Sequence, residues 1–187
     1  MPSRLPLDKQ GQLITAAYQC CVEIGLLSGV FNVELMMTKT GPKLLEINAR
    51  MGGFYLRDWI NRCYGIDLVK TAFLISSGIK PILPKPKPTC HIMGVMCVPS
   101  AHGTLFNDNV VTEKLNDLAK DYEIRYNIIE EEFDLDIAQD MEEPICNIAF
   151  VADDKDKALE GLLMVCDSLG VHNECYDVKK LTESFMV

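Results

Sequence analysis

Apolar residues near the start of the chain recur at the spacing of an α-helix. At a helical period, one face of the helix carries Ile14, Ala17, Cys21 and Ile24. Asp8 precedes this run and is a candidate N-cap, because its carboxylate can accept hydrogen bonds from the free N–H groups of a first helical turn. The pattern therefore predicts a helix that begins near Asp8.

A different pattern follows, in which two runs of strand-forming residues flank a short turn. The runs are residues 30–37 and 43–50. Between them, residues 38–42 include Gly41 and Pro42 and have the composition of a turn. These positions predict an antiparallel hairpin.

Short helices and a proline-rich segment come next. The pattern predicts helices at 55–64 and 67–77. Several prolines between 81 and 88 then exclude both a helix and a central strand. We expect an internal boundary there, with one part at 1–80 and a connector at 81–89.

The remaining part, 90–187, alternates strand and helix patterns. Its apolar periods predict the order strand, helix, strand, strand, helix, at 91–98, 112–121, 123–129, 145–151 and 155–169. This order is typical of a small unit in which helices cover one face of an antiparallel sheet. The predicted fold class of the chain is therefore α+β.

The predicted hairpin gathers polar side chains on one face, because side chains alternate between the two faces along a strand. The first strand contributes Asn32, Glu34 and Met36 to this face, and the second contributes Glu46, Asn48 and Arg50. The opposite face is expected to pack on helices through Val33, Leu35, Leu45, Ile47 and Ala49.

Two facing carboxylates need a neutralising partner. Glu34 and Glu46 would repel each other across the hairpin unless a cation lies between them. Two carboxylates and the amide oxygen of Asn48 suit a hard cation such as Mg²⁺ or Mn²⁺ and not zinc. Because Mg²⁺ is usually held by a few carboxylates together with substrate phosphates, a nucleotide is the implied ligand. An outward polar face without a ligand is the simpler alternative.

Residues just after the second strand add groups that bind anions. Arg50 would extend onto the carboxylate face with a planar fork of donors for phosphoryl or carboxylate oxygens. Gly52 and Gly53 either end the strand in a turn or let the backbone approach an anion, beside the N–H groups of the next helix. Arg57 and Asp58 are candidates for substrate contact or for a surface salt bridge. Together these residues predict a phosphoryl-transfer site.

A glutamate on one strand, followed after a hairpin turn by Glu-x-Asn-x-Arg, resembles the metal-binding signature of the ATP-grasp carboxylate–amine ligases. In this chain the signature is Glu34 and then Glu46-Ile47-Asn48-Ala49-Arg50. The resemblance covers nearly the whole chain, strongly to about Pro88 and more loosely beyond. It implies the C-terminal half of an ATP-grasp fold, followed by a small α+β subdomain of the kind found in L-amino-acid ligases.

The resemblance also implies roles for individual residues. Glu34, Glu46 and Asn48 would hold two Mg²⁺ or Mn²⁺ ions that bridge the phosphates of ATP. Arg50 would stabilise the transferred phosphoryl group or the acyl phosphate, and Met36 would pack against the adenine. Gly52 and Gly53 would line the cofactor site.

Residues 29–65 resemble the branch of this family that joins β-alanine, or a similar ω-amino acid, to L-histidine. In that reaction the carboxylate is activated as an acyl phosphate and then attacked by the histidine amine, which gives a dipeptide, ADP and phosphate. Two alternatives stay open: another ATP-grasp ligase with different substrates, and a non-catalytic chain that keeps the fold and binds metal weakly. Because the family's phosphate-gripping lysines lie upstream of the hairpin, an upstream subdomain is expected to be needed, and the chain alone is expected to be inactive.

Composition narrows the range of partners. A formal net charge of −9 argues against a nucleic-acid partner. A homo-oligomer is left open.

The cysteines and the apolar runs indicate the compartment. The eight cysteines include no C-x-x-C pair, and no apolar run is long enough to span a membrane. A cytoplasmic protein with reduced thiols is therefore expected. Segment 130–143 is expected to be an acidic loop. The scattered histidines, His91, His102 and His172, suggest no zinc site or general base.

Overall fold

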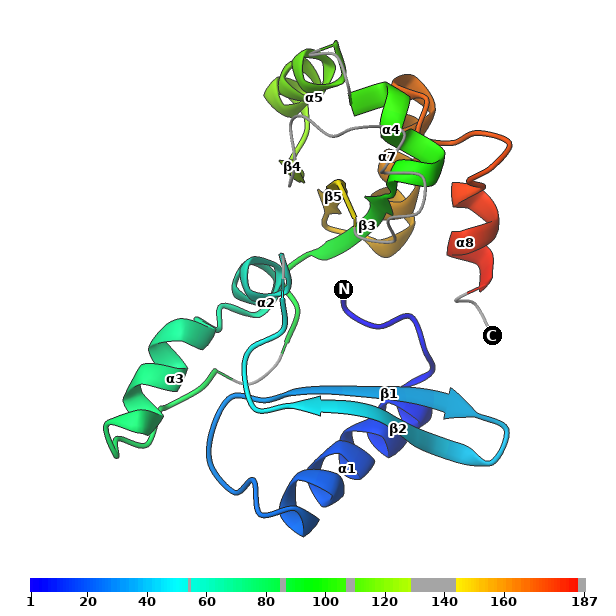
Figure 1. Cartoon of the computed structure of the whole chain (residues 1–187). Helices are drawn as coiled ribbons and strands as arrows, with labels where there is room; N and C mark the ends of the chain where they lie inside the picture. Colours follow the sequence, from blue (N-terminus) through cyan, green and yellow to red (C-terminus); the bar gives the residue numbers. More distant parts are fainter. Residues whose placement is uncertain (54, 85–86, 107–109, 129–143, 185–187) are drawn as a thin grey trace. The chain divides into compact units, whose positions relative to one another are not determined.

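The computed structural model describes residues 1–53, 55–84, 87–106, 110–128 and 144–184, and Figure 1 shows its elements. The chain forms two compact units. Pro2–Thr89 makes up the first, here called the hairpin unit, and Cys90–Val187 together with Met1 makes up the second, the sheet unit. Among the described helices, none is both long and apolar enough to cross a membrane.

The hairpin unit contains the predicted helix, hairpin and pair of short helices. Its elements are α1 (Leu7–Glu23), β1 (Asn32–Thr38), β2 (Gly41–Asn48), α2 (Leu56–Tyr64) and α3 (Leu68–Ser76). Helix α1 lies along the hairpin and contacts both of its strands (Figure 1). This arrangement supports one face of the hairpin and leaves the other face uncovered by α1.

The predicted N-cap of α1 is wrong. The N-cap position is Pro6, which makes no side-chain capping bond, and Asp8 lies within the first turn. Proline fits here because its fixed φ, −53° in this chain, leads into a helix and because it has no N–H to leave unpaired. Asp8 still places a negative charge near the positive end of the helix dipole.

The hairpin turn is shorter than the sequence indicates, and one strand carries an extra residue. Thr38 pairs with Gly41, so the turn itself is Lys39 and Thr40. The register shifts between Glu34 and its neighbour Leu35, because Glu34 pairs with Glu46 whereas Leu35 pairs with Leu44. Leu45 is therefore the unpaired residue of a β-bulge in β2.

The two short helices of the hairpin unit end and begin at the expected residues. Gly65 closes α2 in the left-handed conformation, with a φ of 67°. Asp67 then caps α3 by accepting a hydrogen bond of 2.9 Å from the backbone N–H of Lys70. Trp59 of α2 is buried and stacks on Tyr55, with ring centroids 4.1 Å apart.

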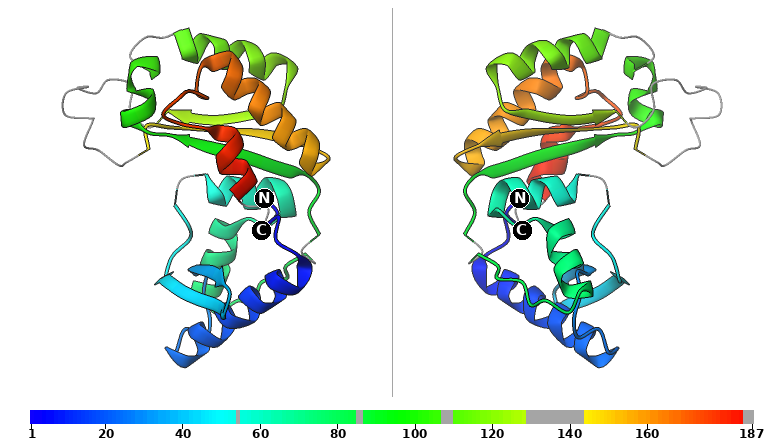
Figure 2. Two further views of the ribbon diagram at one scale, coloured as in Figure 1. Left: turned by 90° about the vertical axis from the view of Figure 1, so that its right-hand side faces the viewer. Right: turned by 90° about the vertical axis from the view of Figure 1, so that its left-hand side faces the viewer.

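The sheet unit has an antiparallel three-stranded sheet in the order β3-β5-β4. Its elements are β3 (His91–Cys97), α4 (Pro99–Phe106), α5 (Val110–Asp121), β4 (Ile124–Ile128), β5 (Cys146–Ala152), α7 (Lys155–Leu169) and α8 (Val178–Ser184). Helices α5 and α7 lie on the same face of the sheet in Figure 2. This confirms the predicted α+β arrangement of an antiparallel sheet packed on helices.

Central strand β5 and helix α7 make the largest contributions to the core of the sheet unit. Ile148 and Leu162 are fully buried, and Phe150 packs with them. Gly161 on α7 faces Phe150 so closely that a Cβ at this position would overlap its ring. The glycine therefore lets the aromatic ring lie flush against the helix backbone.

Two helices of the sheet unit were not expected from the sequence. Helix α4 begins at a proline and contains Gly103, and α8 is a single short stretch near the end of the chain. Neither has the long apolar period that identifies a helix from sequence.

The predicted acidic loop at 130–143 lies outside the described residues.

Candidate metal centre

The register of the hairpin places two carboxylates directly opposite each other. Glu34 on β1 pairs with Glu46 on β2, and both residues are exposed. Partners in an antiparallel pair point to the same face, with Cβ atoms roughly 4.5–5.5 Å apart. The structure thus brings together the two glutamates that the sequence singles out.

Two asparagines extend the carboxylate face by one further pair. Asn32 pairs with Asn48 across the hairpin. The Asn32 amide donates to Glu34 Oε1 at 3.0 Å, and the Asn48 amide donates to Glu46 Oε1 at 2.8 Å. Each strand therefore carries the same Asn–Glu couple, and the four residues form one cluster of oxygen acceptors, here called the carboxylate face.

The chemistry of this donor set fits a hard divalent cation. Each amide donates its N–H to a carboxylate, which leaves its own carbonyl oxygen and the second carboxylate oxygen available as acceptors. Oxygen donors alone suit Mg²⁺ or Mn²⁺. Among the described residues no group of three or more His, Cys, Asp or Glu side chains could hold an ion. A cation here would thus complete its shell with water or phosphate oxygens.

The bulge changes which side chains lie next to the glutamates on the carboxylate face. If side chains alternated strictly along β2, Lys43, two positions before Leu45, would lie on the face that packs on α1. In the structure Lys43 instead pairs with Met36, whose place on β1 is on the carboxylate face. Met36 and the bulge residue Leu45 have exposed fractions of 54% and 60%. An apolar surface with a lysine at its edge therefore lies two pairs along the hairpin from Glu34, at the next position on the same face.

Sequence reasoning missed this placement of Lys43 and put Leu45 on the apolar face. A signal was present in the sequence. With a two-residue turn at Lys39 and Thr40, regular pairing would place Glu34 opposite Leu45. Glu34 can therefore face Glu46 only if the second strand contains one extra residue. The five-residue turn assumed from composition hid this mismatch.

The residues predicted to bind anions lie just beyond β2. That strand ends at Asn48, so alternation does not set the direction of Arg50, whose guanidinium donates to the carbonyl of Met51 at 2.9 Å. A Cβ on Gly52 would lie 2.8 Å from Leu56 Cδ1 and 3.3 Å from Asn32 Oδ1. Gly53 has no neighbour within 4 Å of such a Cβ. The roles assigned to Arg50, Gly52 and Gly53 stay predictions.

Other candidate groups have structural partners. Arg57 and Asp58 form an exposed ion pair of 2.9 Å, which is the surface salt bridge weighed above. Hydrogen bonding to Asp58 raises the pKa of Arg57. His102 is fully buried, with Nδ1 accepting from the Val98 N–H at 3.0 Å and Nε2 bonded to the Val171 carbonyl at 3.0 Å. Its two hydrogen bonds link the residue before α4 to the segment that follows α7.

Three of the cysteines are core residues. Cys97, Cys146 and Cys166 are fully buried. A hydrogen bond to Cys146, followed by burial, raises the pKa of Cys97, and burial raises the pKa of Cys166 to about 12. Thiols with raised pKa values are poor nucleophiles at neutral pH.

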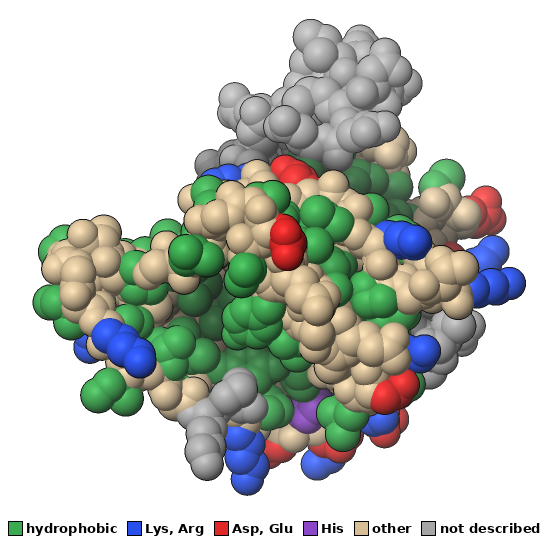
Figure 3. All heavy atoms as spheres, turned by 90° about the horizontal axis from the view of Figure 1, so that it is seen from below, with side chains coloured by type: hydrophobic (Ala, Val, Ile, Leu, Met, Phe, Trp, Pro, Cys, Tyr) green, Lys and Arg blue, Asp and Glu red, His purple; other side chains and the backbone are tan. Residues whose placement is uncertain are grey.

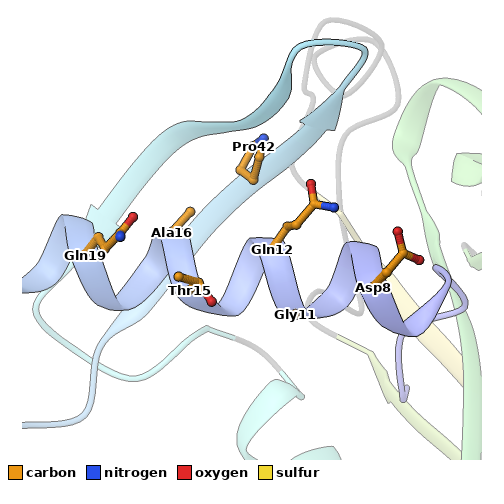
Figure 4. Close-up of a pocket in the computed structure, with 7 residues that line it drawn as sticks. All are labelled: Asp8, Gly11, Gln12, Thr15, Ala16, Gln19 and Pro42. Carbon is orange, nitrogen blue, oxygen red and sulfur yellow. The ribbon is translucent and has the colours of Figure 1, made fainter.

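A groove runs between α1 and the hairpin, as Figure 4 shows. Its lining comprises Asp8, Gly11, Gln12, Thr15, Ala16, Gln19 and Pro42. Pro42 pairs with Met37, which alternates with the glutamate positions and so belongs to the opposite face of the hairpin. The groove is therefore separate from the carboxylate face.

Comparison with known proteins relates the chain to one kind of enzyme. No protein-family model matches the chain. It is 40% identical to carnosine synthase 1 of Mus musculus over 186 residues, which cover 99% of this chain and 22% of that protein. Carnosine synthase 1 of Gallus gallus is 42% identical over 186 residues, 99% of this chain and 20% of that protein. The chain thus spans about a fifth of these relatives, and the predicted resemblance is confirmed.

The crystal structure of an L-amino acid ligase from Bacillus licheniformis is similar in fold. The TM-score is 0.65 at 13% sequence identity, and the match covers 89% of this chain and 43% of that chain. At this identity the likeness concerns the fold alone.

Proposed function

Because the chain is homologous to about a fifth of each carnosine synthase, we propose that it forms the metal-binding portion of an ATP-dependent dipeptide ligase of the ATP-grasp type. The reaction would join β-alanine, or a similar ω-amino acid, to L-histidine, with formation of ADP and phosphate. The observation that carries this proposal is the direct pairing of Glu34 with Glu46.

The carboxylate face would hold the cations. Glu34, Glu46 and Asn48 would bind two Mg²⁺ or Mn²⁺ ions, and the bound ions would neutralise charge on the phosphates of ATP. The exposed side chain of Met36, two residue pairs away on the same face, offers an apolar surface for the adenine. A surface for a base beside oxygen ligands for phosphate-bound cations is the combination that a nucleotide requires.

The remaining chemistry is transfer of a phosphoryl group followed by transfer of an acyl group. A substrate carboxylate oxygen attacks the γ-phosphorus of ATP, ADP leaves, and an acyl phosphate forms. The amine of histidine then attacks the acyl carbon, loses a proton and expels inorganic phosphate. Arg50 would contact the phosphoryl oxygens, and Gly52 and Gly53 would admit the anion close to the backbone. Positioning and charge neutralisation account for catalysis of this kind.

Sequence relatives and fold support different parts of this proposal. The similarity to an L-amino acid ligase supports the architecture and not the reaction, because one fold can carry many chemistries. The choice of β-alanine and histidine rests on the carnosine synthases alone, which are far longer than this chain. We therefore assign the reaction to a longer protein that contains this segment together with an upstream ATP-grasp subdomain.

The test is an assay of phosphate release by the longest gene product that contains this segment. We expect release to depend on ATP, β-alanine and L-histidine together, and to fall at least about 100-fold in Glu46→Gln, because the substitution removes a charged cation ligand. Glu160→Gln, an exposed glutamate on α7, is the matched control and should retain wild-type activity. A second assay replaces β-alanine or histidine with other amino acids.

Each alternative outcome has a distinct meaning. Full activity in Glu46→Gln would remove the metal role of the hairpin. Activity with a different amino-acid pair would keep the ligase and change its substrates. Absence of ATP-dependent product with every pair tested would favour a non-catalytic chain that retains the fold.

A further inference from the structure

The two strands of the hairpin carry the same hydrogen-bonded couple, but only one of the two asparagines belongs to the Glu-x-Asn-x-Arg signature. We infer that Asn32 is a positioning residue that orients Glu34 for cation binding, and that Gly52 is small in order to leave room for the Asn32 amide. This inference rests on the proposed function, because it concerns the same cation site.

The geometry around Asn32 mirrors that around Asn48. The two asparagines are cross-strand partners, and each donates to a glutamate two residues away on its own strand, at 3.0 Å from Asn32 and 2.8 Å from Asn48. The glutamates are themselves partners. The hydrogen bond from Asn32 therefore restrains Glu34 in the same way that Asn48 restrains Glu46.

This restraint matters because both glutamates are exposed. An exposed glutamate samples many rotamers, and a cation that binds two of them must restrict both. A donor that already holds one carboxylate oxygen reduces this entropic cost and leaves the other oxygen for the ion. Outer partners of this kind orient metal ligands throughout proteins.

Gly52 lies against the oxygen end of the same amide. A Cβ there would be 3.3 Å from Asn32 Oδ1 and 2.8 Å from Leu56 Cδ1. The leucine contact is the far end of a flexible side chain and can move aside. Displacement of the asparagine amide, in contrast, would strain its bond to Glu34. Because Gly52 does not have a positive φ, close packing against Asn32 and Leu56, and not backbone conformation, is the local reason for a glycine.

The experiment measures binding of Mn²⁺ to the full chain by electron paramagnetic resonance of the free ion. We expect Asn32→Ala to weaken Mn²⁺ affinity by about 10-fold. Asn32→Gln keeps an amide donor on the same face and should recover part of this loss. Gly52→Ala should weaken binding by about 3-fold in the wild-type background and have no further effect in the Asn32→Ala background, because both substitutions act on one amide.

Two controls make the result specific. Asn127→Ala removes an exposed strand asparagine in the sheet unit and should leave Mn²⁺ affinity unchanged. Fluorescence of Trp59, the lone tryptophan, reports whether each hairpin variant is folded. Glu46→Gln should weaken Mn²⁺ binding in the same assay.

The outcomes separate the inference from the proposed function. Wild-type affinity in Asn32→Ala, beside weakened binding in Glu46→Gln, would overturn the role of Asn32 alone. An equal loss from Gly52→Ala in both backgrounds would overturn the link between Gly52 and Asn32. Wild-type affinity in Glu46→Gln, or no binding by the unaltered chain, would overturn the cation site and the inference with it.

Discussion

The two units of the chain bury their apolar residues to very different extents. The sheet unit has a continuous core in which Leu115, Ile148 and Leu162 are fully buried. The hairpin unit has few buried side chains among its described residues, namely Cys21, Trp59, Cys63 and Thr71. Most of the large hydrophobic side chains that the structure leaves exposed also belong to the hairpin unit. One unit is thus stabilised by a core, and the other depends more on local pairing.

Helix α1 illustrates the difference. Leu7, Ile14, Tyr18 and Val22 recur along one side of the helix with exposed fractions of 84%, 56%, 71% and 57%. Hydrophobic side chains are exposed on the surface seen in Figure 3, which views Figure 1 from below. A two-stranded hairpin is only marginally stable by itself in water. The unit with the candidate site is therefore the one with less stabilisation of its own.

The largest expected effect comes from matched truncations in the two units. Leu162→Ala removes a fully buried side chain from the sheet unit and should lower its free energy of unfolding by about 2–5 kcal/mol. Ile14→Ala removes a side chain that is 56% exposed on α1, and the effect on the hairpin unit should stay within about 0.5 kcal/mol.

Separate probes can follow each unit in that comparison. Trp59 fluorescence during urea unfolding reports on the hairpin unit, and hydrogen exchange of the β5 amides reports on the sheet unit. Equal losses from the two truncations would show that the hairpin unit has a buried interface at Ile14 and would remove the contrast between the units.

Glycine-to-alanine substitutions in helices should have opposite signs in the two units. Gly161→Ala would place a Cβ into the ring of Phe150, and we expect a loss of about 1–3 kcal/mol in the sheet unit. Gly11→Ala on α1 meets no atom within 4 Å and should stabilise the helix by about 0.5–1 kcal/mol. Thermal unfolding by circular dichroism, with the same two local probes, measures both. A stabilising Gly161→Ala would mean that Phe150 moves without cost.

The smallest effect is a pH dependence confined to the sheet unit. Burial lowers the pKa of His102 below its usual value of 6.5, so the folded state binds a proton less readily than the unfolded state. The stability from neutral His102 is complete above about pH 6.5 and decreases as the pH falls below it, by at most about 1.4 kcal/mol per pH unit.

Urea unfolding at pH 7.5 and 5.5 tests this expectation. The difference between the two pH values should shrink in His102→Gln and persist in His91→Gln, which alters a less buried histidine. The lowered pKa values of Asp154 and Asp177 affect stability only at more acidic pH. An unchanged difference in His102→Gln would assign the pH dependence to another group.

Local patterns were sufficient for most of the elements. Apolar periods located α7 and the strands of the sheet unit, and the composition of the turn located the hairpin. The start of α1 was misplaced, since Pro6 occupies the N-cap position that was predicted for Asp8. Helices α4 and α8 were missed because they are short and lack an apolar period, so that packing within the unit decides their conformation.

The sequence by itself determined the identities and spacing of the candidate cation ligands, because Glu34, Glu46 and Asn48 are recognisable from strand alternation and from their chemistry. The sequence also predicted that Glu34 faces Glu46, but through a five-residue turn. Only the three-dimensional structure showed that this pairing comes from a two-residue turn and a bulge at Leu45, which alternation does not reveal. The same bulge placed Lys43 beside Met36, and the packing of Gly52 on Asn32 emerged only in three dimensions. Local propensity acts over a few residues, whereas register and close packing depend on which segments meet.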